Sequence, residues 1–237
     1  METGGAAAAG EVFTSSWIEP QTFDWQALRA RPHRVLRVGK GRAIFTQGDA
    51  VRHVYLVAEG RVRLVLLSAA GQEKHLAVVG PQGMVGECSA FLDGRHSVTA
   101  IASSALVVHE FARAEFQAAV AQDPATLGQV LWLAGSKMRI YAMQNLLLSH
   151  ATAAQRVAHH LAQLAQTYGR AHAQGTAIGI AFTHQEMANI TGISRVMASI
   201  VLKQFQQDGL VLRVQGLWVI RDIANLRRRA VGPAGAV

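Results

Sequence analysis

The first half of the chain alternates short apolar runs with glycine turns. Five runs of six to eight residues, rich in Val, Leu and Ala, lie at 54–60, 61–68, 75–80, 96–102 and 105–111. Runs of this length between glycines are typical of β-strands in a sandwich or a barrel. The pattern therefore predicts a β domain in this part of the chain.

A helical period replaces the strand pattern at Asp123-Pro124. Proline suits the first position of a helix, where no backbone N–H is required. The apolar or small positions that follow are spaced alternately by four and three residues, and they are Leu127, Leu131, Ala134, Met138, Tyr141, Asn145 and Leu148. This heptad seam, with an asparagine in it, is typical of a helix that pairs with a copy of itself. The alternative is a helix that packs on its own β domain.

Two short helices with a glycine turn between them are predicted near the C-terminus. Thr183 and Glu186 have the spacing of a capping box, and Gly192 permits the positive φ of a tight turn. Ser194 is a good N-cap for the second helix, in which positions i, i+3, i+4 and i+7 form an apolar stripe. The stripe consists of Ala198, Val201, Leu202 and Phe205. The pattern predicts a helix-turn-helix, whose second helix has the size that a major groove admits.

Other elements flank this motif. A helix is predicted from Thr152 to Tyr168, a Gly/Ala-rich loop follows it through Gly179, and two short strands are predicted at 210–214 and 217–221. The fold class is therefore α+β. We expect an N-terminal tail at 1–30, a β domain at 31–122, a dimerisation helix at 123–150 and a helix-turn-helix domain at 151–230.

The net charge of +8 is concentrated in the C-terminal part. Residues 1–150 hold 14 Lys and Arg against 12 Asp and Glu, whereas residues 151–237 hold 9 against 3. This asymmetry favours a polyanionic partner for the C-terminal domain. The alternative is a basic, solvated surface.

Composition argues against several classes of protein. No apolar run approaches the roughly 20 residues of a membrane span, and the N-terminal stretch lacks the basic head of a signal peptide, so we expect a cytoplasmic protein. With Cys88 as its one cysteine, the chain cannot build an internal disulfide or an iron–sulfur cluster held by cysteines. The sequence shows no nucleophile motif, no P-loop and no metal-ligand spacing, so we do not expect an enzyme.

Two segments carry a family resemblance: THQEMANITGISRVMASIVLKQFQQDGLV and GPQGMVGECSAFLDGRHSVTA. With the order of the parts, they make the chain from about Arg34 to Arg221 resemble the CRP/FNR family of bacterial transcription regulators. The resemblance implies a jelly-roll-like β-roll of the cyclic-nucleotide-binding type, a long dimer helix and a winged helix-turn-helix. It also implies a homodimer on palindromic double-stranded DNA, RNA polymerase as a partner, a small effector and no membrane. The competing hypothesis is a ligand-sensing module that acts on a protein partner without binding DNA.

The resemblance further implies a DNA-binding surface headed by Arg195, with the 211–220 hairpin as the wing. The expected surface comprises Thr183, His184, Gln185, Ser194, Arg195, Val196, Ser199, Ile200 and Lys203. Val196 and Ile200 stand where better-known members place an acidic residue and a second arginine. Apolar side chains can contact a thymine methyl but cannot hydrogen-bond a base edge. The alternative is that both pack against another element of the protein.

The second segment resembles a phosphate-binding cassette, in which Gly86 and Glu87 match the glycine and the carboxylate. Cyclic-nucleotide binders carry Arg followed by Ser or Thr near its end, whereas here His96 precedes Ser97 and Arg95 stands one step earlier. One step in a strand turns a side chain to the opposite face. The expected effector contacts are Gly86, Glu87, Arg95, His96, Ser97 and, from the long helix, Tyr141.

The identity of the effector stays open at this point. A cyclic nucleotide, another small molecule and no effector at all are the alternatives. Haem held by a histidine such as His75 is a further alternative. The competing interpretation is that His75 is an ordinary surface residue. Cys88 is either a small core residue or a redox switch.

Overall fold

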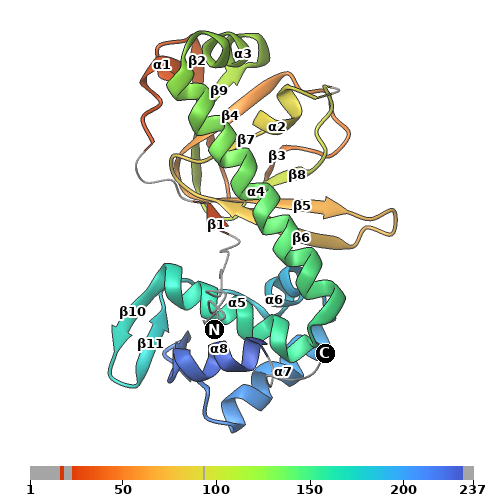
Figure 1. Ribbon diagram of the computed structural model, residues 1–237, viewed down its shortest axis with the longest axis vertical. Coiled ribbons are helices and arrows are strands. Elements are labelled where there is room, and N and C mark those ends of the chain that lie inside the picture. The colour runs from red at the N-terminus through yellow and green to blue at the C-terminus, as the bar shows by residue number, and fades with distance from the viewer. Residues whose placement is uncertain (1–16, 19–22, 93, 232–237) are drawn as a thin grey trace, which may run out of the picture.

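The computed structural model describes residues 17–18, 23–92 and 94–231. A β domain lies at one end, the long helix α4 (Pro124–His150) runs along it, and a mainly helical domain lies at the far end of α4 (Figure 1). Each domain has its own cluster of buried apolar side chains. The predicted α+β fold class is confirmed.

The β domain consists of two sheets. Their strands are β1 (Trp17–Ile18), β2 (His33–Val38), β3 (Ala43–Phe45), β4 (His53–Glu59), β5 (Val62–Leu67), β6 (Glu73–Val79), β7 (Met84–Val85), β8 (Thr99–Ala102) and β9 (Leu106–Ala112). One sheet has the order β1-β6-β5-β8-β3 and the other β2-β9-β4-β7. The helices of this domain are α1 (Gln26–Arg29), α2 (Glu87–Ala90) and α3 (Arg113–Gln122). The five apolar runs correspond to β4, β5, β6, β8 and β9, so the strand pattern predicted this domain correctly.

Part of the expected N-terminal tail belongs to the β domain. Residues 1–16 and 19–22 lie outside the described residues, but β1 pairs in parallel with β6. Trp25 and Leu28 are fully buried, and Trp25 Nε1 donates to the Gln82 carbonyl at 2.9 Å. The expectation of a tail through residue 30 is therefore wrong for residues 23–30, because two large side chains anchor this segment in the core.

Helix α4 begins where the sequence predicts. Asp123 is its N-cap and accepts hydrogen bonds from the backbone N–H groups of Ala125 and Thr126. One face packs on the β domain through buried residues such as Leu133 and Ile140.

The predicted heptad seam lies largely on the other face of α4. In that seam Leu131 is 61% exposed and Met138 71%. Leu127, Asn145 and Leu148 are also exposed, while Ala134 and Tyr141 are half-buried. The helix thus packs on its own β domain and still presents an apolar stripe outward.

The C-terminal domain follows α4. Its elements are α5 (Ala153–Tyr168), β10 (Gly169–His172), β11 (Gly175–Ile178), α6 (His184–Thr191), α7 (Arg195–Gln207), β12 (Val211–Val214), β13 (Leu217–Ile220) and α8 (Ile223–Val231). The strands form one sheet in the order β10-β11-β13-β12. The predicted loop after Tyr168 is therefore wrong, since β10 and β11 form a hairpin. Pairing of β11 with the distant β13 holds this hairpin, and a Gly/Ala-rich sequence gives no local sign of it.

The described helices include none that combines the length and the apolar character of a membrane span.

Candidate nucleic-acid interface and effector cavity

Local hydrogen bonds build the helix-turn-helix as the sequence predicts. Thr183 Oγ1 accepts from the Glu186 N–H at 3.1 Å, and Glu186 Oε2 accepts from the Thr183 N–H at 2.8 Å. Gly192 ends α6 with φ at 67°, and Ser194 Oγ accepts from the Met197 N–H at 3.1 Å. These caps fix where α7 starts and therefore which of its faces is buried.

One face of α7 is buried and the opposite face is open. The predicted stripe Ala198, Val201, Leu202 and Phe205 is buried in the domain core. Arg195 and Lys203 are exposed, and so are Val196 at 69% and Ile200 at 56%. Val196 and Ile200 thus do not pack inside the chain, which removes the alternative role considered for them. The result is a surface with cationic and apolar side chains together.

Ser199 and His184 lie near the exposed face of α7 and contact each other. The Ser199 hydroxyl donates to the Arg195 carbonyl at 3.0 Å, and its oxygen lies 2.8 Å from His184 Nδ1. This contact joins α6 to α7. Thr183 and Gln185 are exposed at the start of α6, and the Gln185 amide donates to Asn189 Oδ1 at 2.7 Å.

A cavity of about 300 Å³ lies between the β domain and α4. Of the expected effector contacts, Gly86, Glu87, Ser97 and Tyr141 line it. Gly86 has φ at 90° and stands as N-cap of α2, a conformation that a side chain would strain. Most of the remaining lining is apolar, and it includes Phe45, Leu64, Val98 and Met138.

A buried ion pair forms one wall of this cavity. Lys137 Nζ lies 2.5 Å from Glu87 Oε1 and 2.9 Å from the Met84 carbonyl oxygen, and the two charged side chains are 6% and 1% exposed. Glu87 Oε2 has no hydrogen-bond partner among the described residues. Burial, followed by the Glu87 charge, raises the pKa of Cys88 to about 12. Its thiol stays protonated, which favours a core residue over a redox switch.

Arg95 and His96 do not line the cavity, so the structure does not bring them together with the other four expected effector contacts. Arg95 is exposed and its Nη1 donates to the Gly48 carbonyl at 2.8 Å. His96 is buried, and its ring stacks on Phe45 with centroids 3.6 Å apart. The one-step offset thus turns the arginine to solvent and puts an imidazole against an aromatic ring. Among the described lining residues Lys137 is the one cation, and Glu87 already neutralises it. These residues do not fit the phosphate of a cyclic nucleotide.

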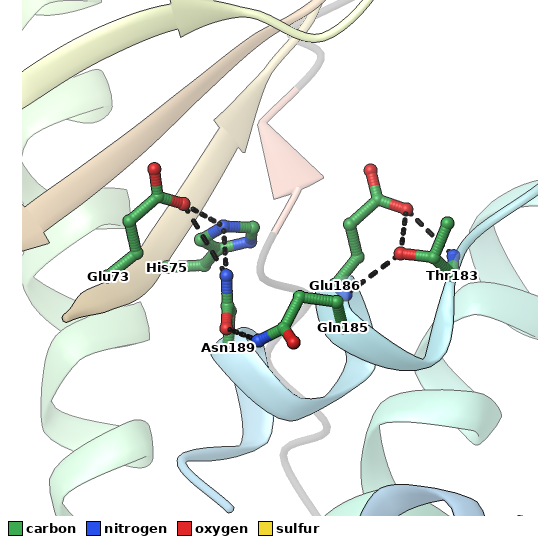
Figure 2. A network of polar contacts seen from close by, with 6 residues as sticks. All are labelled: Glu73, His75, Thr183, Gln185, Glu186 and Asn189. Carbon is green, nitrogen blue, oxygen red and sulfur yellow. Dashed lines mark hydrogen bonds and ion pairs between the residues drawn. The ribbon is translucent and has the colours of Figure 1, made fainter. Parts of the chain in front are cut away.

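The β domain also contacts the helix-turn-helix directly. Asn189 Nδ2 lies 3.4 Å from both Glu73 Oε2 and His75 Nε2 (Figure 2). Lys74 Nζ donates to the Ile190 carbonyl at 2.5 Å. No local pattern in the sequence predicts these contacts, because each joins residues more than 100 positions apart.

His75 sits inside this interdomain contact. It is 5% exposed, and its Nε2 lies 3.3 Å from Glu73 Oε2. Burial lowers its pKa. The described residues contain no group of three or more His, Cys, Asp or Glu side chains placed to hold a metal ion. His75 is therefore a buried member of the interdomain contact and not the plain surface residue considered as the alternative to haem ligation.

Comparison with known proteins identifies the family. A family model described as the cyclic nucleotide-binding domain matches residues 35–123, and one described as the Crp-like helix-turn-helix domain matches residues 155–229. Over 195 residues the chain is 32% identical to the cyclic AMP receptor protein of Thermus thermophilus, covering 82% of this chain and 87% of that protein. The chain belongs to the CRP/FNR family of transcription regulators.

Other CRP/FNR relatives agree. The chain is 27% identical over 192 residues to the CRP-like cAMP-activated global transcriptional regulator of Mycobacterium tuberculosis, covering 81% of this chain and 85% of that one. A solved CRP-family transcriptional regulator from Thermus thermophilus superposes with a TM-score of 0.69 at 26% identity, covering 83% and 97% of the two chains. The predicted class is confirmed: this CRP/FNR protein is a DNA-binding transcription regulator and not an enzyme.

Proposed function

We propose that this CRP/FNR protein acts in the cytoplasm as a homodimer that binds a palindromic operator, under the control of a small effector beside α4. The exposed face of α7 carries the proposal. It presents Arg195, Val196, Ile200 and Lys203 outward while the opposite stripe is buried. Arg195 stands at the start of the helix, where such residues reach base edges or phosphates. RNA polymerase is the protein partner that the family implies.

The outward stripe of α4 supports the dimer. Leu131 and Met138 are among the most exposed large apolar side chains of the described residues, and Trp132 beside them is 47% exposed. Apolar side chains gathered on one helix face mark an interaction surface. A twofold axis along α4 would relate two copies of α7, so the half-sites should lie about one turn of DNA, ~10 bp, apart.

Replacing Arg195 by alanine is expected to weaken binding to the operator by roughly 1–3 kcal/mol and to flatten sequence preference. The operator itself comes from sequencing genomic fragments bound by the wild-type protein, which also reports its symmetry. Fluorescence anisotropy with that duplex then measures the loss of binding free energy. The Arg34→Ala variant removes the same charge from an exposed position on β2 and should bind like the wild type.

Unchanged binding by Arg195→Ala would contradict the role of this residue. A module that acts only through a protein partner predicts weak affinity for DNA with little dependence on salt. The regulator predicts an affinity that falls steeply as salt rises, because phosphate contacts release counterions. The same anisotropy titrations at two salt concentrations separate the two hypotheses.

We infer that the effector is a small, largely apolar molecule with a hydrogen-bond donor. The cavity beside α4 is mainly apolar, and Glu87 Oε2 offers an acceptor that has no partner among the described residues. Burial raises the pKa of Tyr141, so its hydroxyl also stays neutral. Polar groups of this kind orient a ligand in an apolar pocket.

Cyclic AMP is therefore expected to leave the thermal unfolding midpoint unchanged. A ligand at 100 times its Kd would stabilise the protein by about 2.7 kcal/mol and raise Tm by several degrees. Differential scanning fluorimetry measures this, with the cyclic AMP receptor protein of Thermus thermophilus as the positive control. A rise in Tm that saturates with cyclic AMP would show that the cavity accepts a phosphate and that our view of it is wrong.

A further inference from the structure

A second cavity of about 340 Å³ lies between the β domain and the helix-turn-helix. We call it the interdomain cleft; β5, β6, α6 and the β12 strand of the wing contribute to it. His75 of the network in Figure 2 is one of its lining residues. The cleft is separate from the cavity beside α4, and the two share no lining residue.

The cleft is strongly cationic. Its described lining includes Lys40, Arg61, Arg63 and Arg213 against one carboxylate, that of Glu186. That carboxylate already accepts from the backbone N–H and the hydroxyl of Thr183. The histidines that line the cleft add no positive charge, since burial lowers the pKa of both His75 and His160. An excess of positive charge around a concave site attracts anions.

The arginines are placed for an anionic ligand. Arg63 is half-buried, and its Nε is buried without a hydrogen-bond partner among the described residues. A buried polar group in this state has an energetic cost that a ligand can remove. The guanidinium carbon of Arg213 lies 4.8 Å from the centroid of the Trp218 ring. A guanidinium that stacks on a ring through its face leaves the N–H groups at its edge able to donate. Guanidinium groups pair best with carboxylates and phosphates.

The cleft borders the DNA-reading surface at Thr183 and at the wing residue Arg213, but Arg195 does not line it. Positions Glu186, Met187 and Ile190 of α6 line the cleft, whereas Gln185 and Asn189 line a different hollow together with Arg195. The two hollows therefore use different residues of α6 and share no lining residue. Because Arg63 belongs to the β domain and is half-buried in the cleft, the anion is expected to be a free small molecule rather than a phosphate of the DNA backbone.

We propose that the interdomain cleft binds a small polyanion, carrying two or more phosphate or carboxylate groups, that bridges the β domain and the helix-turn-helix. Arg63 of the β domain and Arg213 of the wing would contact it from opposite sides. The proposal does not depend on the DNA sequence that the protein reads, nor on the effector beside α4.

Isothermal titration calorimetry of the full chain tests this site with two probes, inorganic pyrophosphate and citrate. We expect at least one of them to bind with a Kd below about 1 mM. The Arg63→Gln variant should bind about tenfold more weakly, which corresponds to the loss of one charged hydrogen bond. Lys40→Gln, at an exposed position, provides a second test that does not disturb packing. Arg37→Gln, an exposed arginine of β2, should leave the affinity unchanged.

Each outcome decides the proposal. Tighter binding of pyrophosphate or of citrate tells phosphate from carboxylate chemistry, and either supports the site. Lack of binding by both probes to the wild type would overturn it. Equal weakening by Arg37→Gln and Arg63→Gln would also overturn it, because the attraction would then be diffuse. Displacement of the probe by saturating duplex DNA would overturn it too and assign the cleft to the DNA backbone instead.

Discussion

Replacing Lys137 by alanine is expected to lower the free energy of unfolding by about 3–5 kcal/mol. The Lys137 ammonium group is the partner of Glu87 in a pair that is almost fully removed from solvent. Without it, the Glu87 carboxylate would remain buried next to the Cys88 thiol with its charge uncompensated. Urea denaturation followed by tryptophan fluorescence measures the loss, since Trp25 is buried in the same core.

Two comparisons isolate the charge from the loss of packing. Arg139 is an exposed cation two residues along α4, and Arg139→Ala should change stability by less than about 0.5 kcal/mol. The double variant Glu87→Leu/Lys137→Met removes both charges and should recover most of the stability, because apolar replacement of a buried pair is often neutral. If Lys137→Ala costs no more than Arg139→Ala, the pair is not the buried, coupled unit that we describe.

The same ion pair supports our proposal that the effector is not a cyclic nucleotide. Glu87 matches the carboxylate that would accept a ribose hydroxyl, but one of its oxygens is held by Lys137 from α4. Fifty positions separate the two residues in sequence, and Lys137 lies one position outside the heptad seam. The pattern of the sequence therefore showed the glycine and the carboxylate of the cassette but not the lysine that neutralises it.

The helix-turn-helix was the most predictable part of the molecule. Its capping box, its glycine turn and its i, i+3, i+4, i+7 stripe are local signals, and each depends on residues within one or two helical turns. The structure reproduces all of them, from Thr183 to Phe205. The seam of α4 was predictable for the same reason, although its buried opposite face was not.

Contacts between distant segments could not be predicted in this way. Trp25 donates to the carbonyl of Gln82, 57 positions along the chain, and the β10–β11 hairpin depends on pairing with β13. The direction of the Arg95 side chain depends on its hydrogen bond to the Gly48 carbonyl, 47 positions earlier in the chain. The interdomain cleft could not be predicted for the same reason, since Arg63 comes from β5 and Arg213 from the wing.

Lowering the pH from 6.5 to 5 is expected to reduce the stability of the C-terminal domain by about 3 kcal/mol. His159 and His160 of α5 are 9% and 8% exposed. Burial lowers their pKa to about 4 and about 3. The unfolded chain takes up protons on both as the pH falls through 6.5, whereas the folded protein does so only near pH 4 and below. The cost of each histidine therefore approaches about 1.4 kcal/mol per pH unit in this window, and stability falls as the pH falls.

Neighbouring basic side chains act in the same direction on His160. The positive charge of Lys74, and that of His159 and His75 when they are protonated, lowers its pKa further. Urea denaturation at pH 6.5, 5.5 and 5 gives the slope. The variant His159→Gln/His160→Gln should lose most of this pH dependence of stability. The remainder comes from His75, His96 and His109, because burial lowers the pKa of these histidines too. His150→Gln, at an exposed position, is the matched control and should keep the full slope. Equal stability of the wild type at pH 6.5 and pH 5 would mean that these two rings are solvated in the native protein.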